Sequence, residues 1–176
     1  VPGAVNSTGE GYRSAFDHAD EVATAGYYSV LLKDYQVKAE LTATPRVAFQ
    51  RYTYPKSDSS HILFDIGNRQ GESGPVVDAE VSIVSNDLVE GWVKTRPEYS
   101  KKYQDGATVT MYFSAKLDKP AQSFGTFKGK SVQANEKNCK GTGAGAYLTY
   151  STQDGESITA KVGLSYTSVD NARLNR

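Results

Sequence analysis

One short stretch near the start of the chain combines a histidine with acidic side chains. His18 is preceded by Asp17 and followed by Asp20 and Glu21. An imidazole beside carboxylates is the composition of an acid–base pair or of part of a metal site. The same composition is common on solvated loops, and only one histidine is present in this stretch. Taken alone, the stretch therefore favours an exposed loop.

A second candidate is a pair of carboxylates on one strand. Residues 76–84 alternate in polarity, which places Asp78 and Glu80 on the same face, about 7 Å apart. Inverting hydrolysis of a glycosidic bond needs two carboxyl groups roughly 6.5–9.5 Å apart across a sugar ring. The solvent face of a strand produces such pairs without any pocket, so we expect Asp78 and Glu80 to be solvated.

The other reactive residue types are isolated. Cys139 is the only cysteine, so the chain forms no internal disulfide, and its polar surroundings at 138–143 favour an unreactive thiol. His61 begins a strand after a serine-rich turn, and we expect it to be structural. The glycines at 141–145 lack the Gly-Lys-Ser/Thr ending of a phosphate-binding loop. Trp92 can either pack in a core or stack on the apolar face of a sugar ring.

Composition argues against two classes of partner. The 176 residues suit one domain, and 38% hydrophobic residues are enough for a core. No run approaches the roughly 20 apolar residues of a membrane-spanning helix. Twenty basic and twenty acidic residues give a net charge of zero, without a basic stripe. We therefore predict no membrane span and no nucleic acid partner, and we expect a neutral ligand.

The elements that must position these residues are strands. From Gln36 to Thr44 polar and apolar residues alternate, and this period of two is typical of a half-buried strand. Asp154-Gly155 is a hairpin signal between the last two expected strands, and 130–145 is an expected loop. Strand patterns occupy 26–32, 36–44, 46–54, 61–66, 76–84, 88–94, 107–117, 145–152 and 157–166.

This pattern predicts an all-β fold with little helix. We expect a large antiparallel β-sandwich of about ten strands in two stacked sheets, because each strand offers one apolar face. A closed barrel is the alternative. The prediction is a single domain over 1–176, with an irregular lead-in at 1–25 and the sandwich at 26–169. Residues 170–176 are expected to begin a linker or helix, with Asp170 or Asn171 as its N-cap.

Several ordered motifs, spread over nearly the whole chain, resemble the N-terminal domain of glycoside hydrolase family 92. His18 and Glu21 match the family's Ser-His-x-x-Glu pattern, with Asp17 in place of the serine, and Ala25 stands where the family usually has proline. The motifs are GYRSAFDH at 11–18, GYYSV at 26–30, AELTAT at 39–44, RYTYP at 51–55, SHILFD at 60–65, Gly91-Trp92, Tyr112-Phe113 and SVDNA at 168–172.

The resemblance implies a fragment of a larger enzyme. The family contains calcium-dependent, inverting exo-α-mannosidases, in which a β-sandwich packs against an (α/α)6 barrel that holds the acid, the base and the calcium ligands. We expect this chain to end before that barrel and to be inactive alone. We also expect it to lack the Gly/His-rich segment that, in the family, comes before the part of the sandwich domain present here. It would bind no calcium itself, and would supply one wall of a pocket for mannose-containing glycans.

Three further expectations come from the resemblance. The parent enzyme is expected to be an α-1,2-type mannosidase located outside the cytoplasm. His18, Glu21 and Trp92 are the residues of this piece that we expect to contact substrate. The rival hypotheses are an autonomous carbohydrate-binding module, which needs exposed coplanar aromatic residues on one sheet face, and a purely structural scaffold.

Overall fold

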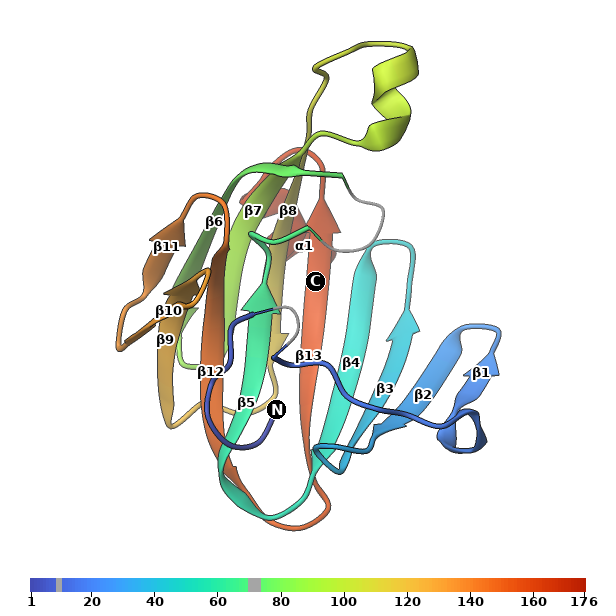
Figure 1. Cartoon of the computed structure of the whole chain (residues 1–176), viewed down its shortest axis with the longest axis vertical. Helices are drawn as coiled ribbons and strands as arrows, with labels where there is room; N and C mark the ends of the chain where they lie inside the picture. Colours follow the sequence, from blue (N-terminus) through green and yellow to red (C-terminus); the bar gives the residue numbers. More distant parts are fainter. Residues whose placement is uncertain (9–10, 70–73) are drawn as a thin grey trace.

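The computed structural model describes residues 1–8, 11–69 and 74–176, and these residues form two antiparallel sheets (Figure 1). The larger sheet has nine strands in the order β1-β2-β3-β4-β13-β8-β7-β6-β11, and the smaller has four in the order β10-β9-β12-β5. The strands are β1 (Val22–Thr24), β2 (Tyr27–Leu32), β3 (Val37–Ala43), β4 (Val47–Tyr54), β5 (Ser57–Asp65), β6 (Val76–Ser85), β7 (Leu88–Thr95), β8 (Val109–Leu117), β9 (Ser123–Lys128), β10 (Ser131–Ala134), β11 (Asn138–Lys140), β12 (Ala144–Thr152) and β13 (Glu156–Ser165).

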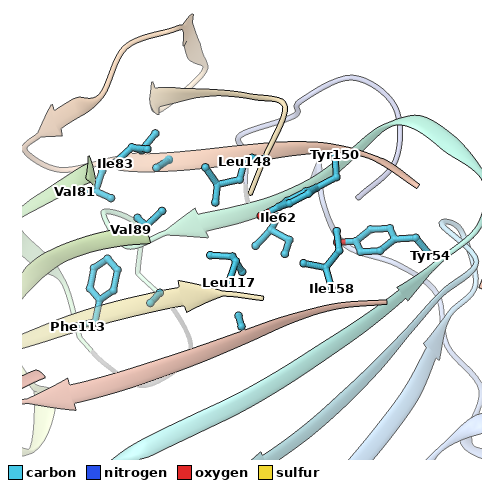
Figure 2. Packing of buried hydrophobic residues seen from close by; sticks show 14 of the residues in the cluster. Tyr54, Ile62, Val81, Ile83, Val89, Phe113, Leu117, Leu148, Tyr150 and Ile158 are labelled. Atoms are coloured by element: carbon cyan, nitrogen blue, oxygen red, sulfur yellow. The ribbon is translucent and has the colours of Figure 1, made fainter. Parts of the chain in front are cut away.

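The two sheets enclose the core that the alternating pattern predicts, which confirms the all-β sandwich. The core residues come from the inward faces of both sheets (Figure 2). Leu148 on β12 and Ile158 on β13 are fully buried, and Phe64 on β5 stacks on Phe113 of β8 with 6.4 Å between ring centroids. Among the described residues no helix is long and apolar enough to cross a membrane.

The chain passes from one sheet to the other at one corner of the sandwich. Asp154-Gly155 does form a tight turn, in which the Glu156 amide donates to the Gln153 carbonyl at 3.0 Å. The two flanking strands do not pair, because β12 belongs to the four-stranded sheet and β13 to the nine-stranded sheet. The predicted hairpin is therefore wrong. The β4–β5 connection makes the same crossing beside it, and the Gly155 amide donates to the Tyr54 carbonyl at 3.0 Å.

Other differences from the expected elements are local. The described residues form thirteen strands rather than about ten, since β1 lies within the expected lead-in, β9 matches none of the expected ranges, and β10 and β11 lie within the expected loop 130–145. The lead-in also holds one short 3-10 helix, η1 (His18–Asp20), and a second one, η2 (Glu98–Lys102), lies between β7 and β8. Gln36 is not part of a strand, because its positive φ of 51° places it in the β2–β3 turn. The alternation expected over 76–84 is interrupted at Val77, which is 43% exposed, because a bulge separates Val76 from Asp78.

The four-stranded sheet covers only part of the larger sheet. The core cluster draws mainly on β6, β7, β8 and β13 of the larger sheet, with Val37 of β3 and Tyr54 of β4 at its margin, while β2 and most of β3 extend beyond the edge strand β5 (Figure 1). The N-terminal segment crosses this uncovered part of the inner face (Figure 1), and there the Tyr35 hydroxyl donates to the Gly11 carbonyl at 3.2 Å. A wide half-covered sheet face is therefore available for contacts.

Helix α1 (Val169–Asn175) packs on the outer face of the nine-stranded sheet, against β13, β8 and β7. It begins two to three residues earlier than expected, because Ser168 is the N-cap and accepts a hydrogen bond from the Asn171 amide at 3.0 Å. Arg173 from this helix makes two hydrogen bonds to Glu90, with Nε to Oε1 at 2.7 Å and Nη2 to Oε2 at 2.5 Å.

The Glu90 carboxylate is almost fully buried under the helix, with 4% of the residue exposed. The hydroxyl of Ser114, its cross-strand neighbour on β8, also donates to Oε1 at 2.8 Å. The Arg173 hydrogen bonds hold the pKa of Glu90 below its usual value, although burial acts in the opposite direction. The helix is therefore attached by a paired charge as well as by packing.

Candidate functional site

The predicted pair His18 and Glu21 does come together, at the edge of the nine-stranded sheet. Asp17 caps η1 by accepting a hydrogen bond from the Ala19 amide at 3.1 Å, and this turn brings His18 back toward the chain that enters β1. His18 Nδ1 lies 2.7 Å from Glu21 Oε2, and the Tyr28 hydroxyl on β2 donates to Glu21 Oε1 at 2.5 Å. The cluster is a hydrogen-bonded His–Glu–Tyr chain on the surface.

The electrostatics of this cluster keep Glu21 ionised. The Tyr28 hydrogen bond, followed by the one from His18, lowers the pKa of Glu21, and the same bond raises the pKa of Tyr28. The His18 side chain is 88% exposed and that of Glu21 is 23% exposed. Such a carboxylate is suited to accept hydrogen bonds from hydroxyl groups, and it is unsuited to donate a proton as a general acid near neutral pH. Contact of His18 and Glu21 with substrate stays a prediction.

Trp92 lies far from this pair. It is on the outer face of β7, where its cross-strand neighbours are Glu80 and Tyr112, and the Lys140 ammonium lies 5.7 Å from its ring centroid. Five strands separate β7 from β1 in the sheet, which corresponds to about 29 Å at 4.8 Å per strand step. Trp92 therefore does not join His18 and Glu21 in one site.

The carboxylate pair on β6 lies on the outer face. Glu80 Oε2 is 3.5 Å from Lys140 Nζ, and Asp78 Oδ1 accepts a hydrogen bond from the Ala79 amide at 2.9 Å. Both contacts belong to a solvated strand face without an enclosing pocket. Cys139, predicted in a loop, lies on the short strand β11 with Sγ 3.4 Å from the Phe127 carbonyl oxygen, half-buried against the core.

A cavity that the sequence did not predict lies where β5 passes over β3 and β4. It has a volume of about 540 Å³, within the range of small-ligand pockets. Its walls are mainly aromatic and aliphatic, with tyrosines from the N-terminal segment, the β2–β3 turn and β4. The lining residues are Val1, Tyr12, Leu32, Tyr35, Val37, Gln50, Tyr52, Tyr54, His61, Ile62, Leu63 and Asp65.

Most polar groups of the cavity already have partners. The Tyr12 hydroxyl donates to Asp65 Oδ2 at 2.5 Å, and the Tyr54 hydroxyl donates to the His61 carbonyl at 3.1 Å. The Tyr52 hydroxyl donates to Gln50 Oε1 at 2.7 Å. This contact leaves the amide nitrogen of Gln50 without a hydrogen-bond partner among the described residues.

The cavity carries little uncompensated charge. Burial lowers the pKa of His61, so its imidazole is mostly neutral at pH 7. His61 is held by hydrogen bonds to the Thr149 hydroxyl at 2.9 Å and to the Gly3 carbonyl at 2.6 Å. Asp65 is contacted by Tyr12 and, at 2.8 Å, by the Asn68 amide. These surroundings favour a neutral ligand over an ion.

No spacing rule brings the cavity residues together, because they come from four separate segments. One signal was nevertheless present. Tyr12, Tyr52, Tyr54, His61 and Asp65 all lie within the motifs at 11–18, 51–55 and 60–65 that carry the family resemblance. The predicted strand alternation also places Gln50, Tyr52 and Tyr54 on one face of β4.

The side chains of the described residues are not clustered as metal ligands. No group of three or more histidine, cysteine, aspartate or glutamate side chains that could hold a metal ion occurs in the described ranges. Calcium prefers six to eight oxygen ligands. Dependence of the whole enzyme on calcium stays a prediction.

Comparison with known proteins decides the family. The sequence profile of the glycosyl hydrolase family 92 N-terminal domain matches residues 1–165. The chain belongs to this family. No curated protein sequence matches the chain. The family 92 domain also has relatives among solved structures, and the family assignment agrees with the predicted resemblance and with the sandwich.

Three solved structures illustrate this likeness. The family 92 α-mannosidase BT3965 from Bacteroides thetaiotaomicron is 26% identical with a TM-score of 0.87, and the match covers 99% of this chain and 24% of that chain. The glycosyl hydrolase ccman5 is 26% identical with a TM-score of 0.76, over 96% and 23%. The inverting mannosidase BT2199 from Bacteroides thetaiotaomicron shares the fold at 22% identity and a TM-score of 0.79, over 99% and 22%. The family 92 domain thus spans about a quarter of the length of these relatives.

Proposed function

We propose that this chain is the accessory N-terminal domain of an α-mannosidase that acts on mannose-containing glycans. The observation that carries the proposal is the match of 99% of the chain, at a TM-score of 0.87, to one quarter of a family 92 α-mannosidase. The chain would supply a pocket wall and a rigid support to a C-terminal (α/α)6 catalytic barrel. An α-1,2 preference, dependence of the whole enzyme on calcium and a location outside the cytoplasm belong to the same proposal.

The described residues support an accessory role and not a catalytic one. Inverting hydrolysis requires an acid and a base on opposite sides of a sugar ring, roughly 6.5–9.5 Å apart. The pair predicted from the sequence, Asp78 and Glu80, lies on a solvated outer face, with Glu80 beside Lys140. Glu21 is kept ionised by Tyr28 and His18, so it is a poor general acid. The acid, the base and the calcium ligands are therefore assigned to the barrel.

The wide sheet gives a physical basis for the support role. Part of the inner face of β1–β4 is not covered by the four-stranded sheet, and an open, mainly apolar groove of about 430 Å³ lies on it. Exposed apolar surface of this kind is typical of contact surfaces between domains. On the opposite face, the Arg173–Glu90 pair fixes the direction of the chain after β13.

Hydrolysis assays test the proposal. Residues 1–176 alone, incubated with α-1,2-mannobiose and calcium, should release no mannose above the buffer control. The whole product of the open reading frame that encodes them should release mannose, and a version without residues 1–176 should not. Free mannose from the chain alone would refute the accessory role. A whole product that cleaves other glycosides but not mannosides would refute the substrate class.

A specific observation also favours a second function, an autonomous carbohydrate-binding module. The expected row of coplanar aromatic residues is replaced by a tyrosine-lined cavity between β5 and β4. Saturable binding of mannose oligomers to the chain alone is the result that a module requires and that a pure scaffold does not give.

A further inference from the structure

We propose that the cavity lined by Tyr12, Tyr35, Tyr52 and Gln50 binds one neutral pyranose unit of a saccharide. Its volume of about 540 Å³ suits one or two sugar rings. The choice of mannose among neutral sugars rests on the function proposed above, whereas the site itself rests on the geometry of the cavity.

The walls match the two surfaces of a sugar ring. Tyrosine rings and the aliphatic side chains of Leu32 and Val37 offer apolar surface to the C–H face of a pyranose. The tyrosine hydroxyls donate inside the protein, for example Tyr35 to the Gly11 carbonyl and Tyr52 to Gln50. Each of their oxygens can still accept a hydrogen bond from a sugar hydroxyl.

Gln50 supplies the complementary donor. Its Oε1 is occupied by the Tyr52 hydroxyl at 2.7 Å, which directs the remaining hydrogen-bonding capacity of the amide to Nε2. That nitrogen has no hydrogen-bond partner in the described part of the chain. A sugar hydroxyl that accepts from it satisfies a half-buried donor, and a purely apolar ligand would not.

Charge excludes the common alternatives. His61 is buried and mostly neutral at pH 7, and the Asp65 carboxylate is contacted by Tyr12 and Asn68. An anionic ligand would find no free cation among these groups, and a cation would compete with existing hydrogen bonds. A neutral ligand with many hydroxyl groups fits best.

The adjoining groove extends the site along the sheet. Gln50 also lines the open apolar groove of about 430 Å³ over β1–β4, together with Leu41, Ala43 and Ala48. In the 176-residue chain alone, where no barrel covers the groove, a second sugar unit can lie there with little hydrogen bonding. We therefore expect a disaccharide to bind more tightly than a monosaccharide, with most of the affinity supplied by the unit in the cavity.

Titration of the 176-residue chain with methyl α-mannoside and α-1,2-mannobiose, followed by ¹H–¹⁵N NMR, tests the site. Saturable shifts should concentrate at residues 35–37, 50–54 and 61–65. Gln50→Leu keeps the size of the side chain and removes the donor, so it should weaken binding about fivefold to tenfold. Tyr52→Phe, which frees the Gln50 oxygen, should also weaken binding. Tyr103→Phe, on a tyrosine that is 82% exposed and does not line the cavity, is the matched control and should change nothing.

Three outcomes would overturn the proposal. They are no saturable binding at tens of millimolar sugar, shifts confined to the Trp92 face, or equal affinity for Gln50→Leu and the unchanged chain. Failure here, combined with mannoside hydrolysis by the whole open reading frame product, would remove only the cavity site. Binding of glucosides with exclusion of mannosides would overturn the choice of sugar.

Discussion

Replacement of Gly163 with alanine should release helix α1 from the outer face of the sheet. A Cβ atom at Gly163 would lie 2.2 Å from the Ala172 carbonyl oxygen and 2.8 Å from the Arg176 backbone nitrogen, whereas ordinary contact begins at 3.4 Å. Both are backbone atoms, so no side-chain rotation relieves the overlap. The helix must move by about 1.2 Å, the difference between 3.4 and 2.2 Å.

A shift of this size breaks the attachment of the helix. Added to the 2.7 Å between Arg173 Nε and Glu90 Oε1, it gives about 3.9 Å, which is beyond hydrogen-bond reach. The buried Glu90 carboxylate then keeps only the Ser114 hydroxyl as a partner. Because the β13 ladders with β4 and β8 do not involve the helix, the sandwich should stay folded while α1 unwinds.

Hydrogen exchange measured by mass spectrometry checks this prediction. The Ala172 amide is bonded to the carbonyl of the N-cap Ser168, and the Arg176 amide to that of Ala172. Both should exchange at least about tenfold faster in Gly163→Ala, while peptides from β12 and β13 keep their protection. Thr159→Ala, on the same face of β13 and outside the predicted overlap, is the control and should match the unchanged chain. Undiminished protection of 169–176 in Gly163→Ala would refute the steric argument.

Three other predictions concern the core and the titrating groups. Leu148→Ala, at a fully buried site, should lower the free energy of unfolding by about 2–5 kcal/mol in a urea titration, and a loss below 1 kcal/mol would contradict the packing described. Burial lowers the pKa of His61 below 6.5, so the unfolded chain binds more protons and stability should fall as the pH drops from 6.5 toward the folded pKa. His61→Gln should flatten this slope between pH 7 and 5, and equal slopes for the variant and the unchanged chain would be inconsistent with the assignment. Tyr28→Phe should raise the pKa of Glu21 toward 4.5 in a ¹³C NMR titration, because it removes the largest cause of the shift, and an unchanged pKa would argue against that hydrogen bond.

The alternation of polar and apolar residues was enough to predict the fold, because the buried face of each strand carries the apolar residues. Within the expected strands 76–84 and 107–117, the apolar alternation corresponds to buried Ala79, Val81 and Ile83 and to buried Phe113 and Ala115. The alternation does not predict which strands pair. An Asp-Gly turn fixes the local geometry of the chain, but it does not determine the partner of either flanking strand. Here the turn at 154–155 joins two sheets. The short strands β10 and β11 carry mostly exposed residues and therefore have no apolar alternation to detect.

In the candidate sites, contacts between residues close in the sequence were predictable, and contacts between residues far apart in the sequence were not. The contact between His18 and Glu21 was predictable because the residues are three positions apart, and one 3-10 turn brings them together. Tyr12 and Asp65 are 53 positions apart, and their contact depends on the path of the N-terminal segment past β5. Trp92 was recognisable as an aromatic residue on a strand, but its face depended on the register that pairs it with Glu80 and Tyr112.

The unequal width of the two sheets connects the fold with the proposed functions. A nine-stranded sheet opposed by four strands cannot bury its whole inner face, and β1–β4 therefore present Leu41, Ala43 and Ala48 to an open groove. Strands β3 and β4 nevertheless hold Glu40 and Arg51 in a bidentate pair on the outer face, with contacts of 2.7 and 2.8 Å that lower the pKa of Glu40 to about 2. The polar face of this extension thus has its own paired charges, while the apolar face is only half covered. An extension built in this way is stable enough to persist and apolar enough to bind, which is what a support for a catalytic barrel or a wall of a sugar site requires.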